Sequence, residues 1–463
     1  MRRRQFLASL GAATAVRAQS ERPPNILLLI FDKCRADALG CYGHAGALTT
    51  NIDQLASSGV RFDHAYTPQA LCGPARASMI TGLYPHTHGL RRNIYPAPGR
   101  SSYSNFPELI VDPFRDTRFR LWHNFVYYLN NAGYATGCVG KWHLGPANPG
   151  FFDTFKAFNS LLRHWVGEPH HSAYRPDIET DEGIRFIEAN AARPWFLEQS
   201  YYAPHEPLDP PKEWAAKFAG TEHPEYHATI ANLDWNVGRI VETLRRRDLL
   251  DNTLIIFTAD HGRTFIDRPG STEGIALPYE EVARVPLILR YPARVAGGKI
   301  WHSGVNLAML APTVFEAAGI TLTQGIRDDS LTPTLQAVSL FGTLGGSDTW
   351  NEPVIVENIP QGTIDGSYFD ERSVRTGRHK LILRKFDQRP EFRPGELYDL
   401  EADPQELRNL YVSQPKLVTE LAGMLESWAL RMHDDTALEL AGNVLNGTTR
   451  RLPKSVTTTR EPR

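Results

Sequence analysis

No stretch of this 463-residue chain is apolar over the roughly 18–20 residues that a membrane-spanning helix needs. An excess of one charge sign is also absent, because 50 lysines and arginines nearly balance 52 acidic residues, for a formal net charge of −2. The chain has no internal repeat and no low-complexity tract, which excludes a solenoid. We therefore expect a globular protein without stable membrane insertion and without a nucleic-acid partner.

Cysteine is scarce, and none of Cys34, Cys41, Cys72 and Cys138 stands in a Cys/His spacing typical of a zinc site. In an exported protein, Cys34 and Cys41 could form a disulfide. We instead expect Cys41 and Cys138 to be small buried core residues, because each lies in or near an apolar, glycine-rich segment. If Cys72 is chemically modified, three cysteines remain and at most one disulfide can form.

Residues 1–18 are typical of a signal peptide of the twin-arginine type. Three arginines at positions 2–4 precede a short apolar run of small residues at 8–16, and residues 16–18 suit a cleavage site. A basic disordered tail is the alternative. We expect export to the periplasm or the exterior. Since the twin-arginine route carries folded proteins, a modification could be completed before export.

Two apolar runs end directly before acidic residues. Residues 26–31 precede Asp32, and residues 254–259 precede Asp260 and His261. A continuous apolar run is typical of a strand buried on both faces of a parallel sheet, and open α/β sheets bind ligands at the carboxyl ends of such strands. The two acids could therefore hold a metal ion between neighbouring strands. The alternative is two independent helix N-caps.

Apolar patterns elsewhere indicate an α/β fold. Further strands are expected at residues 135–140, 194–201 and 286–291, and helices at residues 125–133, 226–247, 312–319 and 417–430. After a Gly/Ser/Thr-rich linker at residues 342–350, short strands follow at hairpin-like intervals. We interpret residues 90–125 as a surface insertion and residues 146–193 as loops that carry surface histidines, namely His164, His170 and His171.

These elements predict two domains in the mature chain. Residues 24–345 would form a catalytic α/β domain with a large mixed sheet sandwiched by helices. Residues 352–435 would form a smaller C-terminal antiparallel sheet with one packed helix. Residues 448–463 are expected to be a disordered tail.

A short motif, C-x-P-x-R, is formed by Cys72, Pro74 and Arg76. By itself it is a weak signal, since the pattern arises by chance and a cysteine is often merely buried or disulfide-bonded. Three more blocks accompany it: G-K-W-H-L-G at 140–145, P-H-E-P at 204–207 and Y-E-E-V-A-R-V-P at 279–286. Together the blocks resemble the type I, formylglycine-dependent sulfatases of the alkaline-phosphatase-like superfamily, over residues 24–435.

The resemblance implies that a modifying enzyme oxidises Cys72 to formylglycine. The hydrated aldehyde carries two hydroxyls on one carbon, so one can attack sulfur and the other can later expel the sulfate. The resemblance also implies a divalent cation, Ca²⁺ with Mg²⁺ as the alternative, bound by Asp32, Asp260, His261 and residue 72. Such a cation would polarise the sulfate oxygens.

Four further side chains receive roles from the resemblance. Arg76 would orient the nucleophile, and Lys141 would bind the sulfate. His143 would accept a proton, and His205 would protonate or steady the leaving alcohol. Because Lys141 and His143 are two positions apart, an extended segment would place them on one side. Alternatively, Lys141 could be a surface lysine beside a structural His143, and His205 could be a histidine that only packs in its turn.

The chain departs from the family pattern at two places. Lys33 stands where relatives carry a second acid or an amide, and no lysine lies between Gly262 and Arg284, where relatives have one that holds the sulfate. Arg263, Arg268 and Lys33 are candidate substitutes. Lys33 could supply the missing sulfate-binding charge from the other side of the pocket, or it could point away and pair with a surface acid, and both readings stay open.

The function implied by the resemblance is hydrolysis of a sulfate ester of a small molecule or glycan, and we favour a sulfated carbohydrate. The enzyme class would be a sulfuric ester hydrolase. Two alternatives remain. Relatives with the same nucleophile and an Asp-His metal pair hydrolyse phosphonate or phosphate esters, and the two departures would also suit an inactive, glycan-binding relative.

Overall fold

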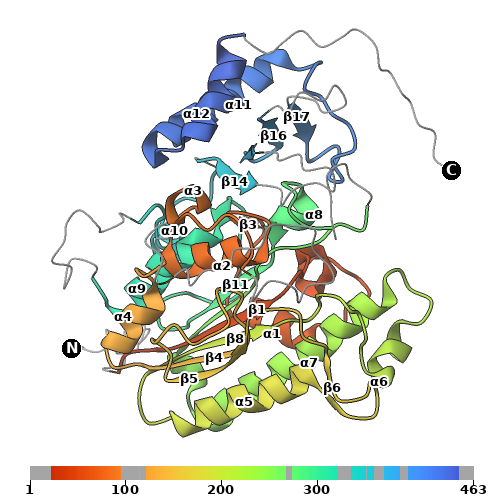
Figure 1. Cartoon of the computed structure of the whole chain (residues 1–463), viewed down its shortest axis with the longest axis vertical. Coiled ribbons are helices and arrows are strands. Elements are labelled where there is room, and N and C mark those ends of the chain that lie inside the picture. Colours follow the sequence, from red (N-terminus) through yellow and green to blue (C-terminus); the bar gives the residue numbers. More distant parts are fainter. Residues whose placement is uncertain are drawn as a thin grey trace, which may run out of the picture.

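An eight-stranded mixed sheet lies at the centre of the structure, a computed structural model that describes residues 22–94, 114, 121–266, 274–321, 335–350, 352–358, 370–385 and 395–447 (Figure 1). The strand order is β12-β2-β11-β9-β1-β8-β4-β5. β1 (Asn25–Phe31) lies between β9 (Thr253–Ala259) and β8 (Trp195–Tyr201) and is parallel to both. Every residue of these three strands is buried, as their apolar runs predict.

The outer strands make the sheet mixed. β4 (Ala135–Lys141) and β5 (Thr154–Phe158) continue it in parallel beyond β8. On the other side, β11 (Leu287–Arg290) is antiparallel to β9 and to β2 (Val60–Phe62), and β12 (Lys299–Trp301) is parallel to β2. Short strands form two smaller sheets: β3 (Ala65–Tyr66), β10 (Arg284–Val285) and β13 (Val305–Asn306) in one, β6 (Trp165–Val166) and β7 (Ala173–Tyr174) in the other.

Helices cover both faces of the large sheet (Figure 1). α5 (Arg175–Ala189) packs on β8 and β4, with α7 (Pro224–Arg246) and α1 (Thr50–Ser58) beside it. The opposite face carries α2 (Cys72–Thr81), α4 (Phe125–Asn131) and α9 (Leu310–Ala318). Short helices complete the fold: α3 (Pro85–His88), α6 (Lys212–Ala215), α8 (Glu280–Ala283) and α10 (Leu340–Leu344). The predicted helix-covered mixed sheet is confirmed.

The C-terminal part forms its own antiparallel sheet, also as predicted. Its strands are paired in chain order: β14 (Val354–Asn358), β15 (Glu371–Arg375), β16 (His379–Arg384) and β17 (Gly395–Asp399). Two helices, α11 (Pro415–Met432) and α12 (Asp435–Leu445), pack on it. Only the first helix was predicted. Trp428 of α11 meets Tyr84 edge-on with ring centres 5.1 Å apart, which joins this part to the segment after α2.

Three sequence-based expectations were wrong, two of them only in part. α5 lies within the region interpreted as loops, because its buried face includes Glu179, Thr180 and Gly183, so its apolar periodicity is weak. The supposed surface insertion contributes Leu90, Ile94, Phe114 and Leu121 to the main core, whereas its Trp122 is exposed as expected. Cys41, expected to be buried, is only half-buried, whereas Cys138 is buried as expected; all four cysteines are free thiols, so the alternative Cys34–Cys41 disulfide is absent.

Other expectations lie outside the described residues. They are the signal peptide at 1–18, the C-terminal tail at 448–463 and most of the segment 95–120. Within the described part of the chain, no helix combines the length and the apolar character that crossing a bilayer requires.

Candidate active site

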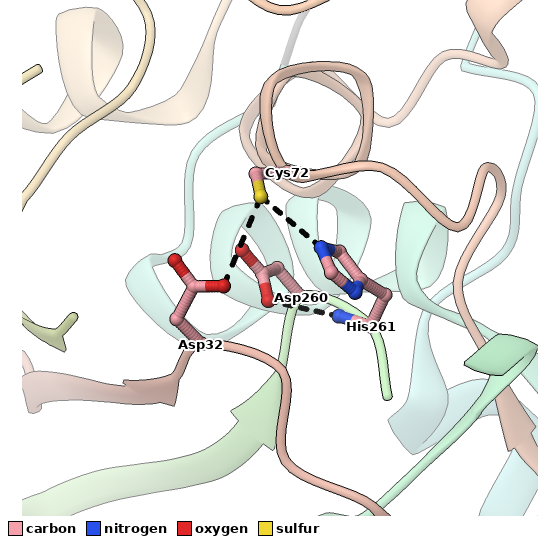
Figure 2. Close-up of side chains that lie close together, drawn as sticks. All are labelled: Asp32, Cys72, Asp260 and His261. Atoms are coloured by element: carbon pink, nitrogen blue, oxygen red, sulfur yellow. Dashed lines mark hydrogen bonds between the residues drawn. The ribbon is translucent and has the colours of Figure 1, made fainter. Parts of the chain in front are cut away.

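Asp32 and Asp260 meet at one edge of the large sheet. β1 and β9 pair in parallel, with Phe31 opposite Ala259, so the residue that follows each strand emerges at the same level. Both aspartates are fully buried. The predicted convergence of two acidic strand ends is therefore correct (Figure 2).

Cys72 reaches the same point from the first turn of α2. Its Sγ lies 3.1 Å from Nε2 of His261 and 3.8 Å from Oδ1 of Asp32 (Figure 2). The helix begins here because Pro74 lies in the first turn, where a backbone N–H has no intrahelical acceptor. Burial and then the charge of Asp32 raise the pKa of the Cys72 thiol to about 12, so the unmodified thiol is neutral.

The donor atoms of Asp32, Cys72, Asp260 and His261 all lie within 4.8 Å of one another. His261 Nδ1 bonds the carbonyl oxygen of Gly262 at 2.7 Å, so Nδ1 carries the proton and Nε2 presents a lone pair to the cluster. Two carboxylates and an imidazole suit a divalent cation, whereas a hard cation prefers oxygen to sulfur. The donor set fits Ca²⁺ or Mg²⁺ better if position 72 offers oxygen.

Arg76, one turn after Cys72 in α2, donates hydrogen bonds to the carboxyl ends of three strands, β9, β4 and β8. Its Nε and Nη2 donate to Oδ2 of Asp260 at 3.0 and 2.9 Å. Its Nη1 donates to the carbonyl oxygen of Lys141 at 2.7 Å and to Oγ of Ser200 at 2.6 Å. Burial alone would raise the pKa of Asp260, but Arg76 and then His261 hold it down to about 2. Asp260 is therefore ionised, and Arg76 fixes its orientation.

Lys141 ends β4 and is fully buried. Its Nζ contacts Oδ2 of Asp32 and lies 5.1 Å from the ring centre of Tyr202. Burial opposes the charged form, but Asp32 and Cys72 outweigh it, so the pKa of Lys141 is raised and the side chain is an ammonium. A cation thus stands beside the cluster, as the sequence predicts.

His143 lies near Lys141, but not for the predicted reason. β4 stops at Lys141, and His143 has φ 56°, so the segment is not extended and strand alternation does not apply. The His143 ring is buried. Burial and then the charges of Lys141 and Arg76 hold the pKa of His143 well below its usual value, which keeps the imidazole neutral.

His205 stands in the turn after β8. Its ring stacks on Tyr202 with centres 4.5 Å apart, and its Nδ1 donates to the carbonyl oxygen of Glu206 at 2.9 Å. The carbonyl oxygen of His205 accepts from Nε2 of His164 at 2.7 Å. His164 is buried, so its interpretation as a surface histidine was wrong. Burial, then Lys33 and Lys141, lower the pKa of His205 well below its usual value.

Lys33 is fully buried and has φ 60°, a conformation uncommon for a residue other than glycine. Its backbone N–H donates to Oδ1 of Asp260 at 3.3 Å, and its Nζ donates to Oε2 of Glu206 at 2.9 Å. Lys33 thus contacts Asp260 through its backbone, while its ammonium is paired with Glu206, the residue that directly follows His205. Glu206 was not singled out from the sequence, although its place in the P-H-E-P turn was the available signal.

Comparison with known proteins agrees with this geometry. The family model described as Sulfatase matches residues 24–320, and that described as N-sulphoglucosamine sulphohydrolase, C-terminal, matches residues 276–431. An arylsulfatase of Clostridium perfringens is 25% identical over 487 residues, covering 84% of this chain and 91% of the relative. An N-acetylgalactosamine-6-O-sulfatase of Bacteroides thetaiotaomicron is 27% identical over 519 residues, covering 88% of this chain and 94% of the relative.

Solved structures show the same fold. The crystal structure of yidJ from Bacteroides fragilis has a TM-score of 0.73 at 24% identity and covers 90% of this chain and 98% of that one. The phosphonate monoester hydrolase of Agrobacterium radiobacter has a TM-score of 0.67 at 22% identity and covers 88% and 96%. Since the Sulfatase model spans more than half of the chain, this protein belongs to the sulfatase family, a family of sulfuric ester hydrolases.

Proposed function

We propose that this protein hydrolyses the sulfate ester of a sulfated carbohydrate, with formylglycine made from Cys72 and a bound Ca²⁺ or Mg²⁺. The observation that carries the proposal is the convergence of Asp32, Asp260 and His261 on Cys72 at the start of α2. Relatives that act on sulfated sugars, such as the N-acetylgalactosamine-6-O-sulfatase, support the choice of a carbohydrate.

Two groups would be added to this site in the active protein. Formylglycine at position 72 would supply, in its hydrated form, a hydroxyl that attacks sulfur. A cation held by Asp32, Asp260, His261 and residue 72 would polarise the sulfate oxygens.

The chain's own residues would bind the substrate and move protons. The Lys141 ammonium would bind a sulfate oxygen, and Arg76 would keep Asp260 and the start of α2 in place. Neutral His143 would accept a proton. Since Nδ1 of His205 donates to Glu206, its Nε2 would face the leaving alcohol and exchange the proton there. Lys33 would add a further substrate-binding cation.

Phosphonate or phosphate ester hydrolysis is the competing function, supported by the shared fold of the phosphonate monoester hydrolase and by the Asp260-His261 pair. Purified, modified protein should be assayed on 4-nitrophenyl sulfate, on phenyl phosphonate esters, and on sulfated mono- and oligosaccharides. Faster turnover of sulfate esters, lost in Cys72→Ala, supports the proposal. Faster turnover of phosphonates would replace it, and binding without turnover would indicate the inactive, glycan-binding alternative.

Export, maturation and domain limits complete the proposal. Residues 1–18 would direct export, and a formylglycine-generating enzyme would act on Cys72 before export. The catalytic domain would span residues 24–345 and the C-terminal domain residues 352–435. Fractionation of expressing cells, with mass analysis of residue 72 in each compartment, tests the first two points. Unmodified thiol in exported, active protein would refute the order of events.

A further inference from the structure

Arg263 is a fixed cation whose donors are only partly satisfied. It lies two positions after His261, and its side chain is 13% exposed. Its guanidinium carbon lies 4.6 Å from the ring centre of Phe265 and 5.8 Å from that of Tyr226, and Arg35 Nη1 donates to its carbonyl oxygen at 3.3 Å. Its Nη1 pairs with Glu206, whereas its Nε is buried and has no hydrogen-bond partner. A buried guanidinium that is held in place and still has a free donor is prepared for an acceptor from outside.

Glu206 connects Arg263 with the candidate active site. One carboxylate oxygen, Oε1, forms an ion pair with Nη1 of Arg263, and the other, Oε2, accepts from Nζ of Lys33 at 2.9 Å. Oε2 also lies 3.3 Å from Nδ1 of His205. Lys33 is fully buried, whereas the Glu206 side chain is 37% exposed. The carboxylate between the two cations is therefore the member of the group that can move to solvent.

Arg263, Glu206 and Lys33 lie on the side of the site where the leaving alcohol would bind. Under the proposed function, His205 faces the alcohol oxygen of the scissile ester, and Glu206 is the next residue. The scissile sulfate would lie on the other side, against Lys141 and the metal cluster. A substituent on the sugar ring would thus be the part of the substrate that reaches Arg263 and Lys33.

We propose that Arg263 and Lys33 form a subsite for a second oxyanion of the substrate, a carboxylate or a second sulfate, and that Glu206 occupies this subsite in the free protein. The planar guanidinium suits a bidentate oxyanion, which would satisfy the donors that Glu206 leaves unused. The inference rests on the proposed function and makes the substrate a sugar with two acidic groups. A neutral sugar would not displace Glu206 from Arg263.

The test compares three substrates on the same sugar scaffold: one sulfate only, two sulfates, and one sulfate with a uronate carboxylate. Wild-type protein should show at least a ~10-fold higher kcat/KM for one of the doubly acidic substrates, the scale of one charged contact. Which of the two is preferred identifies the oxyanion. R263Q should reduce that preference ratio at least ~10-fold, mainly through KM, because the contact exists in ground state and transition state alike.

Two further variants make the test decisive. E206Q should strengthen the preference, since the internal competitor loses its charge. Arg247→Gln, a half-exposed arginine paired with Glu188, is the matched control and should leave all rates unchanged. A preference ratio that is the same in wild type, R263Q and E206Q would overturn the subsite.

Binding separates this inference from the proposed function. Calorimetry with Cys72→Ala protein should show tighter binding of the two doubly acidic sugars than of the singly sulfated sugar on the same scaffold. This difference should disappear in the double variant Cys72→Ala/Arg263→Gln. Absence of sulfate release from every substrate would refute the proposed function alone. Equal binding of the doubly acidic and the singly sulfated sugars would refute the subsite, whatever the turnover.

Discussion

Cys72 Sγ lies 3.1 Å from His261 Nε2, although 189 positions separate the two residues in the chain. The contact exists because α2 begins at Cys72 on one face of the sheet and β9 delivers His261 at its carboxyl edge. Nδ1 of His261 is hydrogen-bonded to the carbonyl oxygen of Gly262. Its Nε2 and the Cys72 thiol therefore lie in one cluster with the carboxylates of Asp32 and Asp260. This arrangement makes position 72 both the candidate nucleophile and a candidate metal ligand.

Loss of either of the two acids proposed to bind the metal should strongly reduce turnover. Asp32→Asn and Asp260→Asn should each lower kcat by at least ~100-fold, because a bound cation offsets developing charge strongly in a site that is shielded from water. Chelator treatment should inactivate the wild-type protein, and Ca²⁺ or Mg²⁺ should restore it. Full sulfate release by protein shown to be metal-free would end the metal assignment.

Removal of the buried lysine should act on substrate binding and on rate. Lys141→Met keeps the length of the side chain but removes the ammonium that contacts Asp32. Sulfate-ester kcat/KM should fall roughly 10- to 1000-fold, the range for one lost charged contact at about 1.4 kcal/mol per decade. Steady-state kinetics measures this, and circular dichroism checks the fold. Unchanged kinetics in a folded variant would remove Lys141 from the site.

His86 should stabilise the protein in a pH-dependent way. Its Nδ1 contacts the carboxylate of Glu357 at 2.5 Å and its Nε2 the carbonyl oxygen of Met432 at 3.0 Å, so both ring nitrogens must donate. Burial would lower the pKa of His86, but the charge of Glu357 outweighs it and the pKa is raised. The stability it contributes is therefore fully present below the unfolded value of about 6.5 and is lost as pH rises through the folded pKa.

Urea unfolding of wild type and His86→Gln checks this sign. The loss of unfolding free energy in His86→Gln should be largest below about pH 6.5 and should shrink as pH rises above it. His171→Gln, at an exposed histidine, is the control and should show no such trend. A loss that grows with pH would contradict the protonated assignment.

Glu179 should destabilise the fold at higher pH. Its two carboxyl oxygens are buried without hydrogen-bond partners, and burial raises its pKa to about 8. The folded state keeps a proton that the unfolded chain loses above about pH 4.5, so stability falls as pH rises from there to about 8. Glu179→Gln should remove this fall and be more stable near pH 8, by on the order of 1–4 kcal/mol.

Thermal and urea unfolding across this pH range measure the effect. Glu222→Gln, at a side chain that is 89% exposed, controls for the loss of one negative charge. Parallel pH profiles for wild type and Glu179→Gln would mean that Glu179 is paired or solvated in the native protein.

The sequence was sufficient to predict which residues lie at the strand ends, but not which side chains form ion pairs around them. Asp32 and Asp260 could be placed because continuous apolar runs identify neighbouring buried strands whose carboxyl ends coincide. The partnership of Lys33 with Glu206 could not, because it joins residues 173 positions apart through a left-handed turn that lysine rarely adopts. The positive φ of His143 likewise escapes an argument from strand alternation.

Buried polar faces explain the missed elements. α5 turns Glu179, Thr180 and Gly183 toward the sheet, so it lacks the apolar stripe by which helices are found in a sequence. His164 was missed for a related reason, since its burial depends on Tyr202 and on the carbonyl of His205. In both cases the neighbours come from distant parts of the chain.

The central claim is that residue 72 acts as formylglycine. Preparations with different degrees of Cys72 conversion should be obtained by varying the supply of the modifying enzyme, and each analysed by peptide mass spectrometry and by sulfate release. The account predicts a kcat proportional to the converted fraction that reaches zero when conversion is zero, with Cys72→Ala inactive but folded. Full activity in a preparation whose residue 72 is an unmodified thiol would contradict it.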